Sequence, residues 1–129
     1  MNRLILFALL LASISVIAQK GECKKLKNGK FKIVDQDLGV DFFIERKGPK
    51  QVEYSDAIKA RMIFEVKWIS DCTYTLVLDK IINNEANIEY PDGLIITVEV
   101  LEVKKDSYLQ RTSSNMHDLI QEKEVFKVR

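Results

Sequence analysis

Residues 60–82 show the clearest alternation of hydrophobic and polar positions in the chain. Because neighbouring side chains of a β-strand point to opposite faces, this alternation predicts two strands, each with one apolar face. The first apolar row consists of Met62, Phe64, Val66 and Trp68. The second consists of Cys72, Tyr74, Leu76 and Leu78. We therefore predict a hairpin whose two rows face one core, where they either pack against each other or line a ligand pocket.

The length of the turn decides whether the two rows share a face. A two-residue turn would pair Ile69 with Cys72 and place the rows on opposite faces. A three-residue connection over 69–71 keeps them together, and Asp71 tolerates the left-handed backbone that ends such a loop. The pairs that follow are Trp68–Cys72, Val66–Tyr74 and Phe64–Leu76. We predict the three-residue connection.

A helix is the competing interpretation of this segment, because Ile58, Met62 and Val66 also recur at the spacing of one helical face. Composition favours strands instead. Residues 19–129 contain 21 valines and isoleucines but three alanines, and β-branched side chains suit a pleated sheet better than a helix.

Further strand-like runs precede and follow the hairpin. They cover 30–34, 40–46, 52–54, 94–103, 108–111 and 124–128. The glycines and prolines lie between these runs, where they favour turns. The apolar residues Val100 and Leu101 are adjacent, which predicts a β-bulge. Asn115 either caps one helical turn or lies in a loop.

About eight short strands on short connections predict an all-β, single-domain antiparallel meander. Such a meander removes both exposed edges when it closes into a barrel. We therefore expect a small lipocalin-like barrel, with a two-sheet β-sandwich as the alternative.

Residues 1–18 have the pattern of a signal peptide. Arg3 precedes an apolar stretch, and Val16 and Ala18 suit the small-residue positions of a cleavage site. We expect cleavage after Ala18, which leaves 19–129 as one domain in the periplasm or outside the cell. An uncleaved anchor is the alternative, although the apolar run is short for a membrane span.

Charge and cysteine content indicate which partners and which cross-links to expect. Without the leader, lysines and arginines balance aspartates and glutamates, so nucleic acid is not an expected partner. Two cysteines in an exported chain predict one structural disulfide, Cys23–Cys72.

The sequence lacks the common catalytic patterns. It contains one histidine, His117, and no GxSxG, HExxH or phosphate-binding glycine loop. The stretch 35–39 begins like a calcium loop, but Gly39 stands at the fifth position and Arg46 at the twelfth, where that loop needs Gly at six and Glu at twelve. We expect an ordinary acidic turn there, no metal, no cofactor and no enzymatic activity.

Three segments carry a resemblance to a known family: CKKLKNGKF, IERKGPKQVEY and KWISDCTYTLVL. Together they resemble a family of short exported Bacteroidetes proteins, and W-x-S-D-C-x-Y at 68–74 is the most specific part. The family supplies no active-site residues to carry over. Some members are labelled DNA topoisomerase IV, a name that implies large cytoplasmic domains for which this chain has no room.

Two functions are compatible with this pattern. The first is a non-enzymatic structural or interaction protein of the envelope or secreted space, monomeric, with an envelope protein as partner. The second is a lipocalin-like binding protein for a small apolar ligand. An eight-stranded barrel holds either its own side chains or one small ligand. The bulk of seven inward residues favours the filled interior: Met62, Phe64, Val66, Trp68, Tyr74, Leu76 and Leu78.

Overall fold

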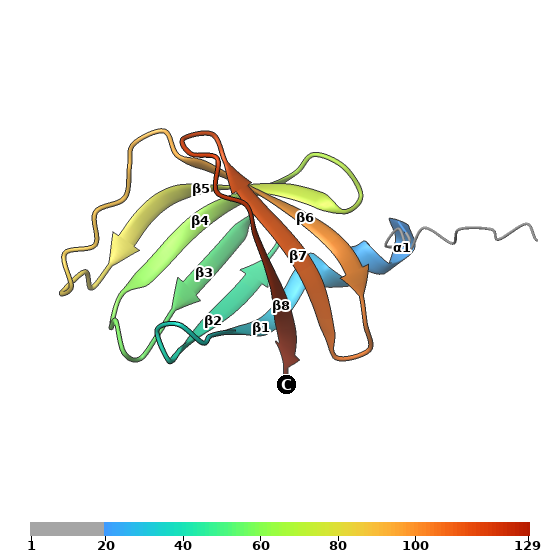
Figure 1. Cartoon of the computed structure of the whole chain (residues 1–129), viewed down its shortest axis with the longest axis horizontal. Coiled ribbons are helices and arrows are strands. Elements are labelled where there is room, and N and C mark those ends of the chain that lie inside the picture. Colours follow the sequence, from blue (N-terminus) through green and yellow to red (C-terminus); the bar gives the residue numbers. More distant parts are fainter. Residues whose placement is uncertain (1–19) are drawn as a thin grey trace, which may run out of the picture.

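The computed structural model describes residues 20–129, which form eight β-strands and two short helical segments (Figure 1). The predicted signal peptide, 1–18, lies outside the described residues. The strands are β1 (Asn28–Asp35), β2 (Val40–Lys47), β3 (Lys50–Tyr54), β4 (Arg61–Trp68), β5 (Thr73–Ile82), β6 (Ile95–Val103), β7 (Ser107–Ser114) and β8 (Gln121–Val128). Each contains one of the predicted strand segments in whole or in large part.

The strands follow one another around a closed antiparallel barrel, as expected from the meander pattern. β8 returns to β1 through three residue pairs, 30–32 with 126–128. We call this junction the seam. Because the ring is closed, the all-β barrel is confirmed and the two-sheet sandwich is excluded.

The central hairpin has the predicted faces but not the predicted register. Trp68 lies opposite Tyr74, two residues further along than expected. Ile69 N donates to Thr73 O at 2.9 Å, so the three-residue loop is 70–72. The predicted pairs are therefore wrong. Asp71 does not have the left-handed backbone expected at the end of the loop; among the described residues other than glycine, such backbone occurs at Lys59, Asn83 and Asn87. A shift by two residues preserves both faces, so the hydrophobic pattern does not distinguish the two registers.

Two irregularities bend the wall of the barrel. The predicted bulge in β6 is confirmed by a register shift between Val100 and Glu102. A second shift lies between β4 and β5, where Ile63 pairs with Lys80 and Phe64 pairs with Leu78. At such a shift one strand contains an extra residue, which increases the local twist and helps the sheet to close.

The N-terminal segment covers one end of the barrel, which we call the closed end (Figure 1). It consists of α1 (Lys20–Cys23) and η1 (Lys24–Leu26). The predicted disulfide is present, with the Cα atoms of Cys23 and Cys72 5.3 Å apart. Cys23 and Leu26 have no exposed surface. Among residues 20–129, neither helical segment is long and apolar enough to cross a membrane.

The opposite end, the mouth, is formed by the longer connections 36–39, 55–60, 83–94 and 115–120. Asn115 lies in a loop rather than in a helical turn. Its side-chain oxygen accepts from Ile95 N at 2.8 Å, and its side-chain nitrogen donates to Gly93 O at 3.0 Å. These bonds tie two neighbouring connections of the mouth together.

Candidate functional site: the barrel interior

A buried arginine occupies the half of the interior near the closed end. Arg46 is 1% exposed. Its Nη1 donates to Leu26 O at 2.6 Å, and its Nε donates to Gln51 Oε1 at 2.8 Å. Its Nη2 lies 2.8 Å from the Tyr74 hydroxyl and 3.2 Å from the Tyr108 hydroxyl. The guanidinium therefore joins the N-terminal segment to strands on several sides of the barrel.

Aromatic rings surround the same guanidinium. Its carbon lies 5.0 Å from the ring centre of Phe31 and 4.7 Å from that of Tyr74, distances at which a cation is attracted to the ring face. Phe31 also meets Tyr108 edge-to-face at 5.5 Å. This half of the barrel is filled by its own side chains.

The half nearer the mouth contains an inner cavity of about 130 Å³. Its lining combines strand residues from several sides of the barrel: Ile44, Gln51, Glu53, Tyr74, Leu76, Ile96, Val98, Gln110 and Thr112. A mouth cavity of about 270 Å³ shares Ile96 and Thr112 with it and is bounded by the 115–120 connection, including His117 and Leu119. The two spaces therefore lie side by side along β6 and β7.

Glu53 places a carboxylate in the inner cavity. Its Oε1 accepts from Gln51 Nε2 at 2.9 Å, which links it through Gln51 to Arg46. The side chain lies inside the barrel yet keeps part of its surface accessible, because it faces the cavity. Burial raises the pKa of this carboxyl above its ordinary value, and the Gln51 hydrogen bond and the Arg46 charge oppose that rise.

The raised pKa predicts that Glu53→Gln stabilises the protein at neutral pH. A group with a raised folded-state pKa favours folding below its unfolded pKa, and this contribution is lost as the pH rises through the folded pKa. Glutamine resembles the protonated acid at every pH. We therefore expect a higher urea midpoint for the variant at about pH 7.5 and a difference that shrinks towards about pH 4.

Glu45 provides the matched control, because it is exposed on the outer face of β2. Glu45→Gln should leave the midpoint nearly unchanged at both pH values. A destabilised Glu53→Gln variant at neutral pH would contradict the proposed burial cost of the carboxylate.

Three further polar groups have no hydrogen-bond partner among residues 20–129: the Gln110 amide, the Tyr90 hydroxyl and Trp68 Nε1. Gln110 is 7% exposed and lines the inner cavity, yet its side-chain amide bonds to none of the described residues. The Tyr90 hydroxyl and Trp68 Nε1 are buried without a partner among these residues. Burial, with a contribution from Glu53, raises the pKa of Tyr90 to about 12. Unpartnered buried polar groups are costly and often belong to functional sites.

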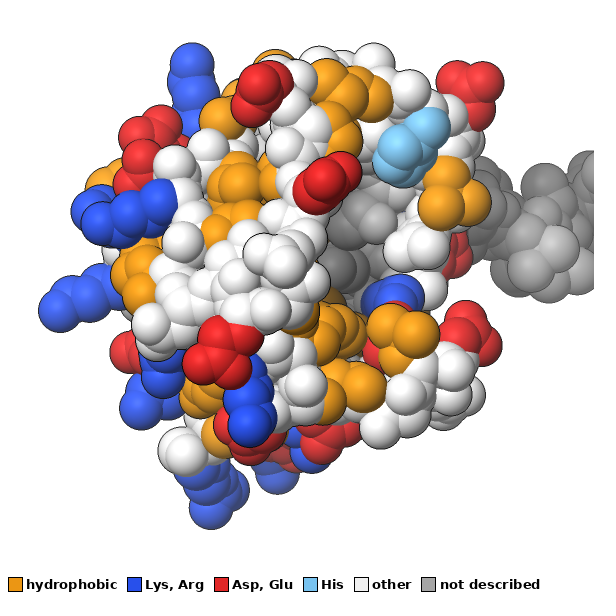
Figure 2. All heavy atoms as spheres, turned by 90° about the vertical axis from the view of Figure 1, so that its left-hand side faces the viewer, with side chains coloured by type: hydrophobic (Ala, Val, Ile, Leu, Met, Phe, Trp, Pro, Cys, Tyr) orange, Lys and Arg blue, Asp and Glu red, His pale blue; other side chains and the backbone are white. Residues whose placement is uncertain are grey.

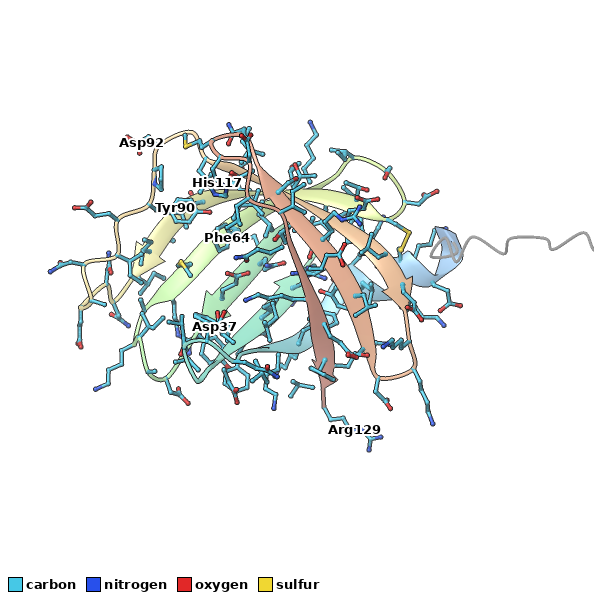
Figure 3. The ribbon with its side chains drawn as sticks, in the orientation of Figure 1. Asp37, Phe64, Tyr90, Asp92, His117 and Arg129 are labelled. Carbon is cyan, nitrogen blue, oxygen red and sulfur yellow. A yellow bond between two sulfur atoms is a disulfide. The ribbon has the colours of Figure 1, made fainter. Side chains whose placement is uncertain are left out.

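Two of the seven predicted inward residues, Tyr74 and Leu76, line the inner cavity. Phe64 and Val66 are buried in the core, and Phe64 meets Tyr90 edge-to-face at 5.9 Å (Figure 3). The remaining three pack against that core and are partly buried: Met62, Trp68 and Leu78.

The comparisons with protein-family models, curated proteins and solved structures returned no match. The resemblance to short exported Bacteroidetes proteins therefore stays a prediction.

The polar residues of the interior were not predicted from the sequence. In β3, Val52 and Tyr54 form the apolar row, whereas Gln51 and Glu53 line the cavity. Tyr54 instead stacks on Phe43 at 5.3 Å. One sequence signal could have revealed this arrangement. The strands β2 and β3 carry apolar residues on a second face, and such a pattern does not show which face of a strand points inward.

The acidic stretch 35–39 forms a turn, as predicted. Asp35 Oδ1 accepts from the backbone nitrogens of Asp37 and Leu38, both at 3.1 Å, and its other oxygen pairs with Lys123 at 3.3 Å. These hydrogen bonds, that of Leu38 first, lower the pKa of Asp35. Within residues 20–129, no group of three or more His, Cys, Asp or Glu is placed to hold a metal.

Proposed function

We propose that this protein is a non-catalytic binding protein that holds a small ligand in the mouth half of its barrel. The observation that supports this proposal best is the Gln110 amide, which faces a cavity and has no hydrogen-bond partner among the described residues. A ligand that accepts or donates a hydrogen bond there would supply the partner that this amide lacks.

The shape of the mouth supports the same proposal. The mouth cavity and the inner cavity share part of their lining, so a molecule in the mouth cavity lies next to the space that Gln110 lines. Several large apolar side chains of the surrounding connections are exposed: Leu38, Met116, Leu119 and Ile120. Figure 2 shows this end of the barrel, with hydrophobic side chains beside His117. Such a rim would favour the entry of a molecule with an apolar part.

The disulfide supports an oxidising compartment as the location of this protein. Disulfides persist in oxidising compartments and are rare in the cytosol, and Cys23–Cys72 joins the N-terminal segment to the barrel. We propose export to the periplasm or the outside of the cell, in agreement with the predicted leader.

The outer surface favours a second candidate function, an interaction with another envelope protein. Phe43 and Tyr54 stack on the outside of β2 and β3, and the Arg61 guanidinium lies 4.6 Å from the Tyr54 ring centre. Phe126, on β8, is 40% exposed. Aromatic and arginine side chains are enriched in protein interfaces.

Titration with 2-phenylethanol tests the binding proposal, because its ring fits an apolar wall and its hydroxyl can bond to Gln110. We expect saturable heat in calorimetry and a change in Trp68 emission, since the Trp68 ring lies 4.6 Å from that of Tyr74, which lines the inner cavity. Gln110→Leu should weaken binding about 5-fold, the effect of one hydrogen bond.

Gln36→Leu is the matched control, because Gln36 is exposed in the β1–β2 connection. It should bind the alcohol as the unchanged protein does. A Gln110→Leu variant with unchanged affinity would place the alcohol elsewhere and count against the cavity as the binding site.

A further inference from the structure

The two ends of the barrel carry opposite charge, although the whole chain has a formal net charge of only +1. The four connections at the mouth contain one lysine, Lys59, and six acidic residues: Asp37, Asp56, Glu85, Glu89, Asp92 and Asp118. Figure 3 labels Asp37 and Asp92 on this side of the molecule. The segments at the closed end (21–27, 48–49, 69–72, 104–106 and 129) contain three acidic residues and six basic ones: Lys24, Lys25, Lys27, Lys104, Lys105 and Arg129.

This arrangement makes the potential at the mouth negative. Charges of one sign around a cavity with low-dielectric walls concentrate the field inside it, which attracts ligands of opposite charge and repels those of the same charge. A cation therefore enters this barrel more readily than an anion of the same shape.

Inside the cavity, Glu53 is the ionisable carboxylate that an entering molecule meets. Within residues 20–129 it forms no ion pair within 4 Å, and its side chain accepts one hydrogen bond, from Gln51. A carboxylate can accept several more. The acceptor sites that Gln51 leaves open are therefore available to a donor in the cavity.

Arg46 does not offer a competing site for an anion. Its guanidinium nitrogens already donate to the Leu26 carbonyl, to Gln51 and to the Tyr74 and Tyr108 hydroxyls. Arg46 is fully buried and does not line the cavity, whereas Gln51 and Glu53 do. An anion in the cavity would thus meet the Glu53 carboxylate without gaining a free arginine donor.

We infer that the ligand carries an ammonium group that binds Glu53, while Gln110 bonds to a second polar atom and the apolar wall of Leu76 and Ile96 contacts the remainder. The chemical class is a small organic amine with an apolar body. This inference rests on the proposed function and adds the charge of the ligand to it.

Three probes of similar shape and different charge test the inference. They are 2-phenylethylamine, which is cationic at neutral pH, 2-phenylethanol, which is neutral, and 3-phenylpropionate, which is anionic. By calorimetry at low ionic strength, we expect the amine to bind about 10-fold or more tightly than the alcohol, because a hydrogen bond to a charged group is stronger than a neutral one. The anion should bind most weakly.

Glu53→Gln keeps the shape of the side chain and removes its charge. The variant should lose the preference for the amine, so that it binds amine and alcohol with similar affinity. Glu45→Gln, on the outer face of β2, should keep the full preference. Circular dichroism and thermal unfolding of both variants verify that each is folded before binding is compared.

The outcomes separate this inference from the proposed function. Equal affinity for amine and alcohol, or a preference for the amine that survives Glu53→Gln, overturns the inference and leaves a binding protein for a neutral ligand. Tightest binding of the anion also overturns it. If none of the three probes binds, both the inference and the proposed function fail.

Discussion

Replacing Arg46 by methionine should lower the free energy of unfolding by about 3–5 kcal/mol, because several buried hydrogen-bonding groups lose their partner at about 1–3 kcal/mol each. Methionine fills much of the space but accepts and donates no hydrogen bond. The Leu26 carbonyl, the Gln51 side chain and two tyrosine hydroxyls would stay buried without their common partner, and each such loss is costly. Urea unfolding followed by Trp68 emission measures the effect.

Arg111→Met is the matched control for this substitution. Arg111 lies on the outer face of β7, where its Nη2 pairs with Glu122 at 2.7 Å and its side chain is 43% exposed. Exposed ion pairs contribute about 1 kcal/mol or less, so this variant should unfold close to the unchanged protein. Similar urea midpoints for the Arg46 and Arg111 variants would show that the buried network does not hold the barrel together.

Removing the disulfide should lower the free energy of unfolding by an amount comparable to that of the Arg46 substitution. Cys23 and Cys72 are 49 residues apart in the sequence, and a cross-link over such a loop stabilises a fold by roughly 4 kcal/mol in the chain-entropy model. The double variant Cys23→Ser/Cys72→Ser should therefore unfold at a clearly lower urea concentration. It should also expose the N-terminal segment to proteases, because Cys23 is one of the residues that attach this segment to the barrel.

A reducing agent provides the control within the same experiment. Dithiothreitol should lower the urea midpoint of the unchanged protein towards that of the double variant, and it should have no effect on the variant itself. Two free thiols in the denatured, unreduced protein would contradict the disulfide.

The strands and their inward faces could be predicted because period-two alternation is a local property. Phe64, Val66, Tyr74 and Leu76 lie in the core as their spacing indicates. The register of the hairpin could not be predicted, since a shift by two residues leaves every face unchanged. The closing of the ring was predictable in outline, because a meander of this length leaves two edges that benefit from pairing.

The polar interior could not be predicted for a different reason. Arg46 lies in a strand whose apolar residues form an inward row, but its charge favours an exposed position unless partners are present. These partners, Leu26, Tyr74 and Tyr108, are up to 62 positions away in the sequence. Burial of a charge is favourable only when all such partners are in place. Only the three-dimensional arrangement brings these partners together. The residues close to Arg46 in the sequence therefore give no reason to expect a buried charge.

The seam between β1 and β8 has a consequence for the folding of the chain. It is held by three residue pairs, whereas β1 and β2 share eight, and its two strands, β1 and β8, are the first and last strands in the sequence. Contacts between distant parts of a chain form late, because the entropy of closing the loop is lost before the contact is gained. Until then β1 and β8 present open edges that can pair with another molecule. The passage from open sheet to closed ring is therefore the stage at which this protein is most exposed to aggregation.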